Sequence, residues 1–118
     1  MKEKKIRPHQ TSLTEALGRL CLVMRLRLRL RQPEAAARCG IARLSPLERG
    51  WYVPTAETVL KILDGLNATP EERQEACLLW TVMQSPRIAA TAFGVEPDDD
   101  GKVVMQRILE VKRHDRAS

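Results

Sequence analysis

Residues 32–50 read QPEAAARCGIARLSPLERG, and this stretch predicts two short helices joined by a turn. Pro33 suits the first turn of a helix, because an amide at that position would have no partner inside the helix in any case. Gly40 ends this first helix. Residues 45–48, SPLE, then predict a second helix in which the serine and the glutamate form a capping box, and Gly50 ends it.

Upstream of this stretch, Ser12 followed by Glu15 predicts the capped start of a longer helix. Apolar residues then recur at helical spacing, at Leu13, Leu17, Leu20, Cys21, Met24 and Leu28. The run from Arg25 to Arg31 alternates arginine and leucine, which taken alone is typical of a strand. Because the capped helical pattern runs directly into it, we expect helix through about Arg27.

Downstream, three more helix starts are predicted. Thr55 begins a helix closed by Asn67, and Thr69 with the following proline begins one that runs to about Met83. Ser85-Pro86 opens a shorter segment through Phe93, after which an acidic run at residues 98–100 suggests a loop.

A last helix is predicted from the apolar stripe Val104, Ile108 and Val111. A stripe of this kind on a short terminal helix cannot be buried by that helix alone. It either folds back on the helix from Thr69 or packs against a second copy of the chain. We favour the second copy, and so a homodimer.

The composition favours a small all-α protein. Of the 118 residues 43% are hydrophobic and only 3% aromatic, with leucine and alanine abundant. No apolar run approaches the roughly 20 residues of a membrane span, so we expect no membrane association and a cytoplasmic location.

The net charge of +5 is unevenly distributed. Residues 19–49 contain eight arginines and two acidic residues, whereas residues 50–100 contain three basic and nine acidic residues. A basic front half beside an acidic middle suggests one face suited to a polyanion, although such segregation also occurs in proteins that bind acidic proteins or nothing.

The three cysteines, Cys21, Cys39 and Cys77, lack the CxxC spacing of a metal site, and their odd number argues against a disulfide framework. Each is interpreted as a small buried apolar residue. No metal and no cofactor are expected. An enzyme is not expected either, because no paired carboxylates, phosphate-binding loop or nucleophile–base arrangement is recognisable.

Spaced residues across about 68 positions form a combined pattern: Leu17-Gly18, Met24-Arg25, Leu30, Gln32, Ala36, Gly40-Ile41, Leu47-Glu48-Arg49-Gly50, Val53-Pro54 and Glu57-Thr58. Together they resemble the XRE family of lambda-repressor-like DNA-binding domains. The resemblance implies a five-helix bundle, here with a helical C-terminal extension, in which residues 32–50 form the helix-turn-helix.

One departure from the family pattern lies between Gly40 and Gly50, where the chain has two residues fewer than usual. Pro46 falls in the same place, and a proline inside a helix would cost about 3 kcal/mol. The recognition helix is therefore expected to begin at Pro46, capped by Ser45, and to present Arg43 and Ser45 from the preceding turn.

The resemblance implies DNA-contacting roles for several residues. Arg43 lies where the family meets base edges, and arginine can donate two hydrogen bonds to guanine. Ser45 is a phosphate contact or only a helix cap. Gln32 would face the phosphate backbone at the start of its helix, or simply cap it.

Three further residues are candidate DNA contacts of a less specific kind. Arg31 would supply long-range attraction to phosphate. Trp51 and Tyr52 would either pack on the phosphodiester backbone or cover the core. Arg25 has a different implied role, an ion pair with Glu48 that holds the first helix against the third.

We therefore expect a flexible basic arm at residues 1–11, a helix-turn-helix domain at 12–84, and a helical extension at 85–118 for dimerisation or a protein partner. The predicted function is a sequence-specific transcriptional regulator of double-stranded DNA, most simply a dimeric repressor. Two alternatives stay open. The chain is either a protein-interaction module of the same fold that acts on the transcription machinery, or an antitoxin that binds a toxin through its C-terminal segment.

Overall fold

The computed structural model describes residues 11–96 and 101–117, with side chains described as far as residue 110. This part of the chain is all-α, without strands. Its helices are α1 (Ser12–Arg27), α2 (Gln32–Cys39), α3 (Ser45–Glu48), α4 (Ala56–Gly65), α5 (Pro70–Gln84), α6 (Pro86–Ala92) and α7 (Lys102–Ala117). The expected arm at residues 1–11 and the acidic loop at 98–100 lie outside the described residues, apart from Thr11.

Helix α1 is capped one residue before the predicted cap. Thr11 is the N-cap, and its hydroxyl accepts a hydrogen bond from the amide of Thr14, whose own hydroxyl accepts from the amide of Thr11. The predicted capping box of Ser12 and Glu15 is therefore wrong, since a threonine pair one position earlier performs the same function.

The alternating Arg–Leu run does not form a strand. As predicted, α1 continues through Arg27. It stops there because Arg29 adopts a left-handed backbone conformation, with φ at 59°, and its amide bonds to the carbonyl of Leu26. The chain then turns into α2.

Helix α2 runs from Gln32 to Cys39 and ends as predicted at Gly40, whose φ of 71° suits glycine best. Helix α3 is a single turn of four residues. The capping box predicted within residues 45–48 is wrong: Leu44 is the N-cap and supplies no side-chain hydrogen bond. The Glu48 carboxylate is engaged elsewhere, as described below.

The remaining predicted helix starts are confirmed. Thr55, Thr69 and Ser85 each accept a hydrogen bond from the amide three residues ahead, at Thr58, Glu72 and Ile88 respectively. Helix α4 ends at Gly65, slightly before the predicted Asn67, which has a φ of 55° just beyond the helix.

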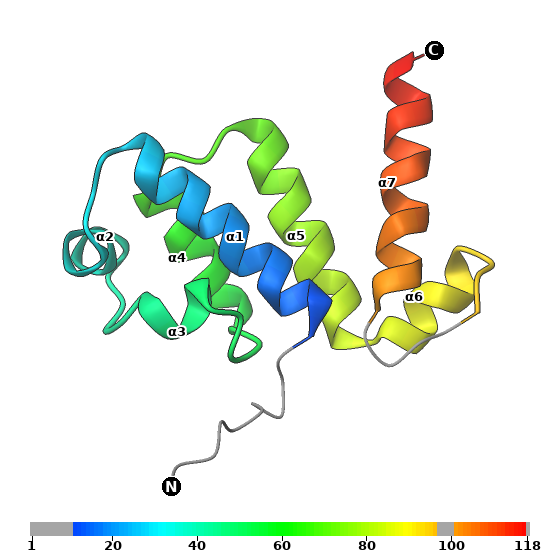
Figure 1. Cartoon of the computed structure of the whole chain (residues 1–118), viewed down its shortest axis with the longest axis horizontal. Coiled ribbons are helices and arrows are strands. Elements are labelled where there is room, and N and C mark those ends of the chain that lie inside the picture. The colour runs from blue at the N-terminus through cyan, green and yellow to red at the C-terminus, as the bar shows by residue number, and fades with distance from the viewer. Residues whose placement is uncertain (1–10, 97–100, 118) are drawn as a thin grey trace, which may run out of the picture.

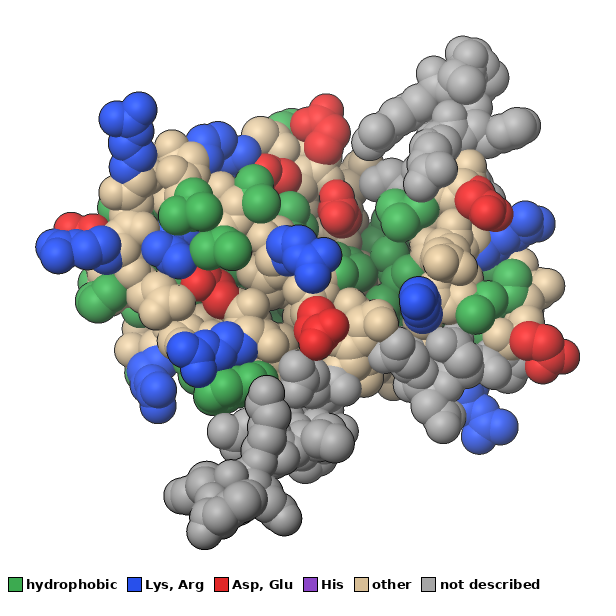
Figure 2. All heavy atoms as spheres, viewed as in Figure 1, with side chains coloured by type: hydrophobic (Ala, Val, Ile, Leu, Met, Phe, Trp, Pro, Cys, Tyr) green, Lys and Arg blue, Asp and Glu red, His purple; other side chains and the backbone are tan. Residues whose placement is uncertain are grey.

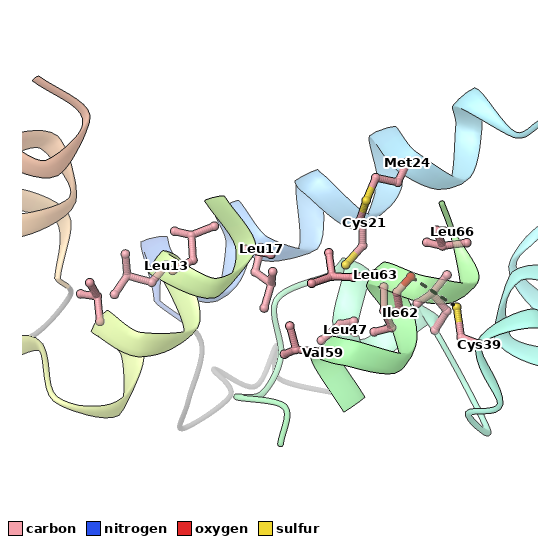
Figure 3. Close-up of a cluster of buried hydrophobic side chains, with 14 of the residues drawn as sticks. Leu13, Leu17, Cys21, Met24, Cys39, Leu47, Val59, Ile62, Leu63 and Leu66 are labelled. Atoms are coloured by element: carbon pink, nitrogen blue, oxygen red, sulfur yellow. Dashed lines mark hydrogen bonds between the residues drawn. The ribbon is translucent and has the colours of Figure 1, made fainter. Parts of the chain in front are cut away.

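The core lies beneath α1, which packs against α3 and α5, while α2 packs against α4. Figure 3 shows Leu17, Cys21 and Met24 of α1 facing apolar side chains of α3 and α4. The largest fully buried side chains include Met24, Leu44, Leu47, Ile62, Leu63, Leu66, Leu79 and Val104. Helices α2 and α3 lie at the end of the molecule away from α6 and α7 (Figure 1).

Helix α7 folds back on its own chain, against α6 and α1. Its Val104 is fully buried and Ile108 is 3% exposed. These two residues are therefore covered without a second copy, and the expectation that they form a dimer interface is wrong. The side chain of the third predicted stripe residue, Val111, lies outside the described residues.

Two of the three cysteines are buried as predicted, Cys21 and Cys39. Burial raises the pKa of the Cys21 thiol to about 12, so it stays protonated at neutral pH. The prediction is wrong for Cys77, which is exposed on α5.

Among the described residues, no cluster of three His, Cys, Asp or Glu side chains could hold a metal ion. Within the same ranges, no helix combines the length and apolar character needed to cross a lipid bilayer.

Candidate nucleic-acid interface at the α2–α3 turn

An ion pair between Arg25 and Glu48 joins α1 to α3. Arg25 Nε donates to Glu48 Oε2 at 2.6 Å and Nη2 donates to Oε1 at 3.1 Å, so the contact is bidentate. The two side chains are only 12% and 6% exposed. Arg25 Nη1 also donates to the carbonyl of Leu30 at 2.9 Å, which fixes the chain as it enters α2. The pair expected from the family resemblance is thus present.

Gln32 completes this network from α2. Its Nε2 donates to Glu48 Oε1 at 2.8 Å, so the carboxylate receives hydrogen bonds from both α1 and α2. One of the two amide hydrogens of Gln32 is therefore occupied inside the protein. Three helices meet at the Glu48 carboxylate, and this fixes the base of the turn between α2 and α3.

The backbones of α1 and α3 come into direct contact beside this network. A Cβ added at Gly18 would lie 2.4 Å from the carbonyl oxygen of Glu48 and 2.6 Å from that of Leu47. Thr14, one turn earlier, donates its hydroxyl hydrogen to the carbonyl of Gly50 at 2.8 Å. Both ends of the segment from α3 to Gly50 are therefore held against α1.

A groove of about 290 Å³ lies in front of this framework. It is lined by Gln32, Pro33, Ala36, Ala42, Arg43, Leu44 and Ser45. The structure thus brings together three of the predicted DNA contacts: Gln32, Arg43 and Ser45. Leu44 is buried and anchors the turn, whereas Ala42 and Arg43 are exposed.

Arg43 contributes a guanidinium group to the lining of this groove. Among the residues whose side chains are described, no acidic group forms an ion pair with it. Ser45 is half-buried and does not cap α3, so its predicted role as a helix cap is wrong. Its hydroxyl is available for another partner.

The start of α2 is less favourable to an anion than the sequence suggests. Glu34 accepts a hydrogen bond from the amide of Arg31 at 2.8 Å, and this bond lowers the pKa of the Glu34 carboxyl, which stays ionised at neutral pH. The Arg31 side chain is 84% exposed and lies 3.7 Å from the Glu34 carboxylate. A carboxylate at this helix start opposes phosphate binding there, whereas the exposed guanidinium of Arg31 favours it.

The segment after α3 contains a cation that sequence reasoning missed. The Arg49 guanidinium lies over the Trp51 ring, 5.0 Å from its centroid. This stacking restrains an exposed guanidinium whose N–H groups point outward around its edge. An arginine two residues before a tryptophan, just past the helix end, is the signal in the sequence that could have indicated it.

Trp51 and Tyr52 have different surroundings. Trp51 supports Arg49, whereas Tyr52 packs against the core, where burial raises the pKa of its hydroxyl. Neither residue lines the groove. The other predicted site residues, Val104 and Ile108, lie on α7, at the opposite end of the molecule (Figure 1).

No family model, curated protein or solved structure matches the chain.

Proposed function

We propose that the chain is a sequence-specific DNA-binding regulator of transcription, built on a lambda-repressor-like five-helix arrangement of α1–α5. The observation that carries this proposal is Arg43, an exposed arginine without an ion-pair partner among the described side chains, placed at the tip of a rigidly held turn beside Ser45. An arginine in that position can donate two hydrogen bonds to a guanine edge.

Because α3 is short, the residue that reads bases lies in the turn before this helix and not on the helix itself. Four residues of helix span only about 6 Å, less than the helix that commonly lies in a major groove. Arg43 then reads bases, while Ser45, Arg31 and Arg49 bind phosphate on either side of it. Trp51 contributes through Arg49, and Tyr52 supports the fold.

Gln32 serves first to position the site and second as a phosphate contact. One amide hydrogen holds Glu48, so the other is the donor left for a phosphate oxygen. Loss of Gln32 is therefore expected to weaken binding to all sequences rather than to change the preferred sequence.

We further propose that the regulator acts as a homodimeric repressor in the cytoplasm. Ile88 of α6 and Val103 and Leu109 of α7 are 71%, 40% and 37% exposed. Among the described side chains, they are the large apolar groups of the extension that remain for a partner now that Val104 and Ile108 are buried. Two copies related by a two-fold axis would read an inverted repeat.

The test is selection of bound duplexes from a random DNA pool by the purified, folded chain, followed by sequencing. We expect an inverted repeat to be enriched, and Arg43→Ala to relax the preference at one position of each half-site. Arg87→Ala is the matched control, because Arg87 is exposed on α6, away from the groove. A single enriched half-site would contradict the dimer, and the absence of enrichment would contradict sequence-specific binding.

The second candidate function is a protein-interaction module of the same fold, and the single turn of α3 is the observation that favours it. Salt dependence separates the two candidates. A groove reader with several phosphate contacts loses orders of magnitude in DNA affinity between low and moderate salt. An interaction module shows only weak binding to DNA without sequence preference.

A further inference from the structure

The Arg–Leu run places two arginines on opposite flanks of α1. Arg25 pairs with Glu48 of α3, and Arg27 pairs with Glu72 of α5 through Nη1–Oε2 and Nη2–Oε1 contacts of 2.7 and 2.8 Å. Residues two apart on a helix point about 200° apart, so the residue between them faces outward. Leu26 is that residue, and it is 56% exposed.

Leu26 belongs to an outward stripe on α1. Arg19, Val23 and Leu26 follow one another at i, i+4 and i+7, which is the spacing of one helix face. Val23 is 51% exposed, and Leu22 beside it is half-buried. We call Arg19, Val23 and Leu26 the α1 ridge. The inward face of α1 contributes apolar side chains to the core. The helix is therefore apolar both on this face and on the outward face that carries the ridge.

Basic groups lie at both ends of this apolar surface. Arg19 is one turn before Val23, and Arg29 follows the end of α1, where its amide bonds to the carbonyl of Leu26. Both are exposed, and among the described side chains neither forms an ion pair. Figure 2 shows apolar side chains and Lys or Arg side chains side by side on the face of the molecule that α1 covers.

We propose that the α1 ridge binds an acidic amphipathic helix of a partner protein. Two neighbouring apolar side chains would contact the apolar face of that helix, and the guanidinium groups of Arg19 and Arg29 would meet its Asp or Glu residues. This proposal does not depend on DNA binding.

Two other occupants fit the ridge less well. DNA offers phosphates to Arg19 and Arg29 but leaves Val23 and Leu26 without an apolar partner. A second copy of the chain offers Ile88 of α6, which is 71% exposed beside the basic Arg87, and Leu60 of α4, which is 53% exposed between acidic residues. Those acids, Glu57 and Asp64, are already paired with Lys61 and Arg73.

The test is selection from a displayed library of 16-residue helical peptides on the full chain, followed by affinity measurement with the enriched peptides. We expect enrichment of Leu or Ile at i, i+3 and i+4 positions flanked by Asp or Glu. V23S with L26S should weaken binding at least tenfold, and Arg19→Glu should weaken it and be rescued by peptides in which Lys replaces the acids.

Leu60→Ser is the matched control, since it removes a similarly exposed apolar side chain from α4, and it should leave peptide binding unchanged. Thermal unfolding of each variant establishes that it is folded. Enriched peptides that bind the V23S/L26S variant as tightly, enrichment of basic peptides, or no enrichment would each overturn the proposal. So would sedimentation that shows self-association lost in V23S/L26S, because the ridge would then bind a second copy.

Discussion

At the scale of single residues, the most consequential contact is the bidentate pair of Arg25 and Glu48. We expect Arg25→Ala to lower the free energy of unfolding by about 3 kcal/mol, because it leaves a carboxylate that is only 6% exposed without its main partner. Urea denaturation measures this difference.

The matched control for that prediction is Arg27→Ala. Arg27 also makes a bidentate pair, but its side chain is 41% exposed, so water and salt weaken the interaction. Its loss should lower stability clearly less than the loss of Arg25 does. Equal unfolding midpoints for wild type and Arg25→Ala would refute the role given to Arg25.

At the scale of helices, the crossing of α1 over α3 depends on Gly18. Alanine is the better helix former by about 1 kcal/mol. Gly18→Ala should nevertheless lower the free energy of unfolding by a net of about 1–3 kcal/mol. The added methyl group would meet two backbone carbonyls of α3, which cannot move aside as a flexible side chain can. Thermal unfolding tests this, and Arg19→Ala, on the exposed side of α1, should change stability by less than about 0.5 kcal/mol.

The start of α5 gives the fold a dependence on pH. The hydrogen bond from Arg27 and the bond from the Thr69 amide lower the pKa of the Glu72 carboxyl below its ordinary value of 4.5. Because the folded-state pKa is the lower one, the stabilisation from Glu72 is complete above the ordinary pKa and is lost as the pH falls through the folded-state value.

We therefore expect wild type to melt at a higher temperature than Glu72→Gln at pH 7, and the two melting temperatures to converge below about pH 4. Melting curves across this pH range measure the difference. A constant difference at every pH would mean that Glu72 acts through shape and neutral hydrogen bonds instead of charge.

Helix boundaries were predictable wherever a local signal fixed them. Thr55, Thr69, Ser85 and Gly40 each act within three residues of themselves, so the sequence pattern sufficed. The cap predicted at residues 45–48 failed because Arg25 and Gln32, distant in sequence, take the Glu48 carboxylate.

The candidate site was predictable in part for the same reason. Gln32, Arg43 and Ser45 were expected near one another because a short turn joins them. The inward direction of the Gln32 amide depends on a partner 16 residues away, and the stacking of Arg49 on Trp51 depends on the path of the chain after α3. Neither follows from residue spacing.

At the scale of the whole molecule, α7 is part of the fold. Ile108 is 3% exposed, so Ile108→Ala should lower the free energy of unfolding by about 2–4 kcal/mol through loss of buried apolar contacts. The molar mass in solution should not change. If the Ile108→Ala variant instead had a lower molar mass in solution and unchanged stability, Ile108 would contribute to a contact between copies of the chain.

At the same scale, the positive charge of residues 19–49 can be assigned to particular contacts and surfaces. Four of the eight arginines are engaged within the protein: Arg25, Arg27 and Arg31 in ion pairs, and Arg38 as a donor to the carbonyl of Gly65. Arg43 lies at the α2–α3 turn and Arg49 directly after α3, while Arg19 and Arg29 flank the α1 ridge. The remaining positive charge therefore serves two separate surfaces.

The turn between α2 and α3 has a consequence for how such a protein can diverge. Its buried anchor, Leu44, adjoins the exposed Ala42 and Arg43, so mutations at those two positions leave the core intact. Under selection, descendants of this chain could exchange the residues at the tip, and so change the charge and polarity of this surface, while inheriting the same stable scaffold. The separation of anchor from tip makes the surface chemistry of the turn and foldability nearly independent traits.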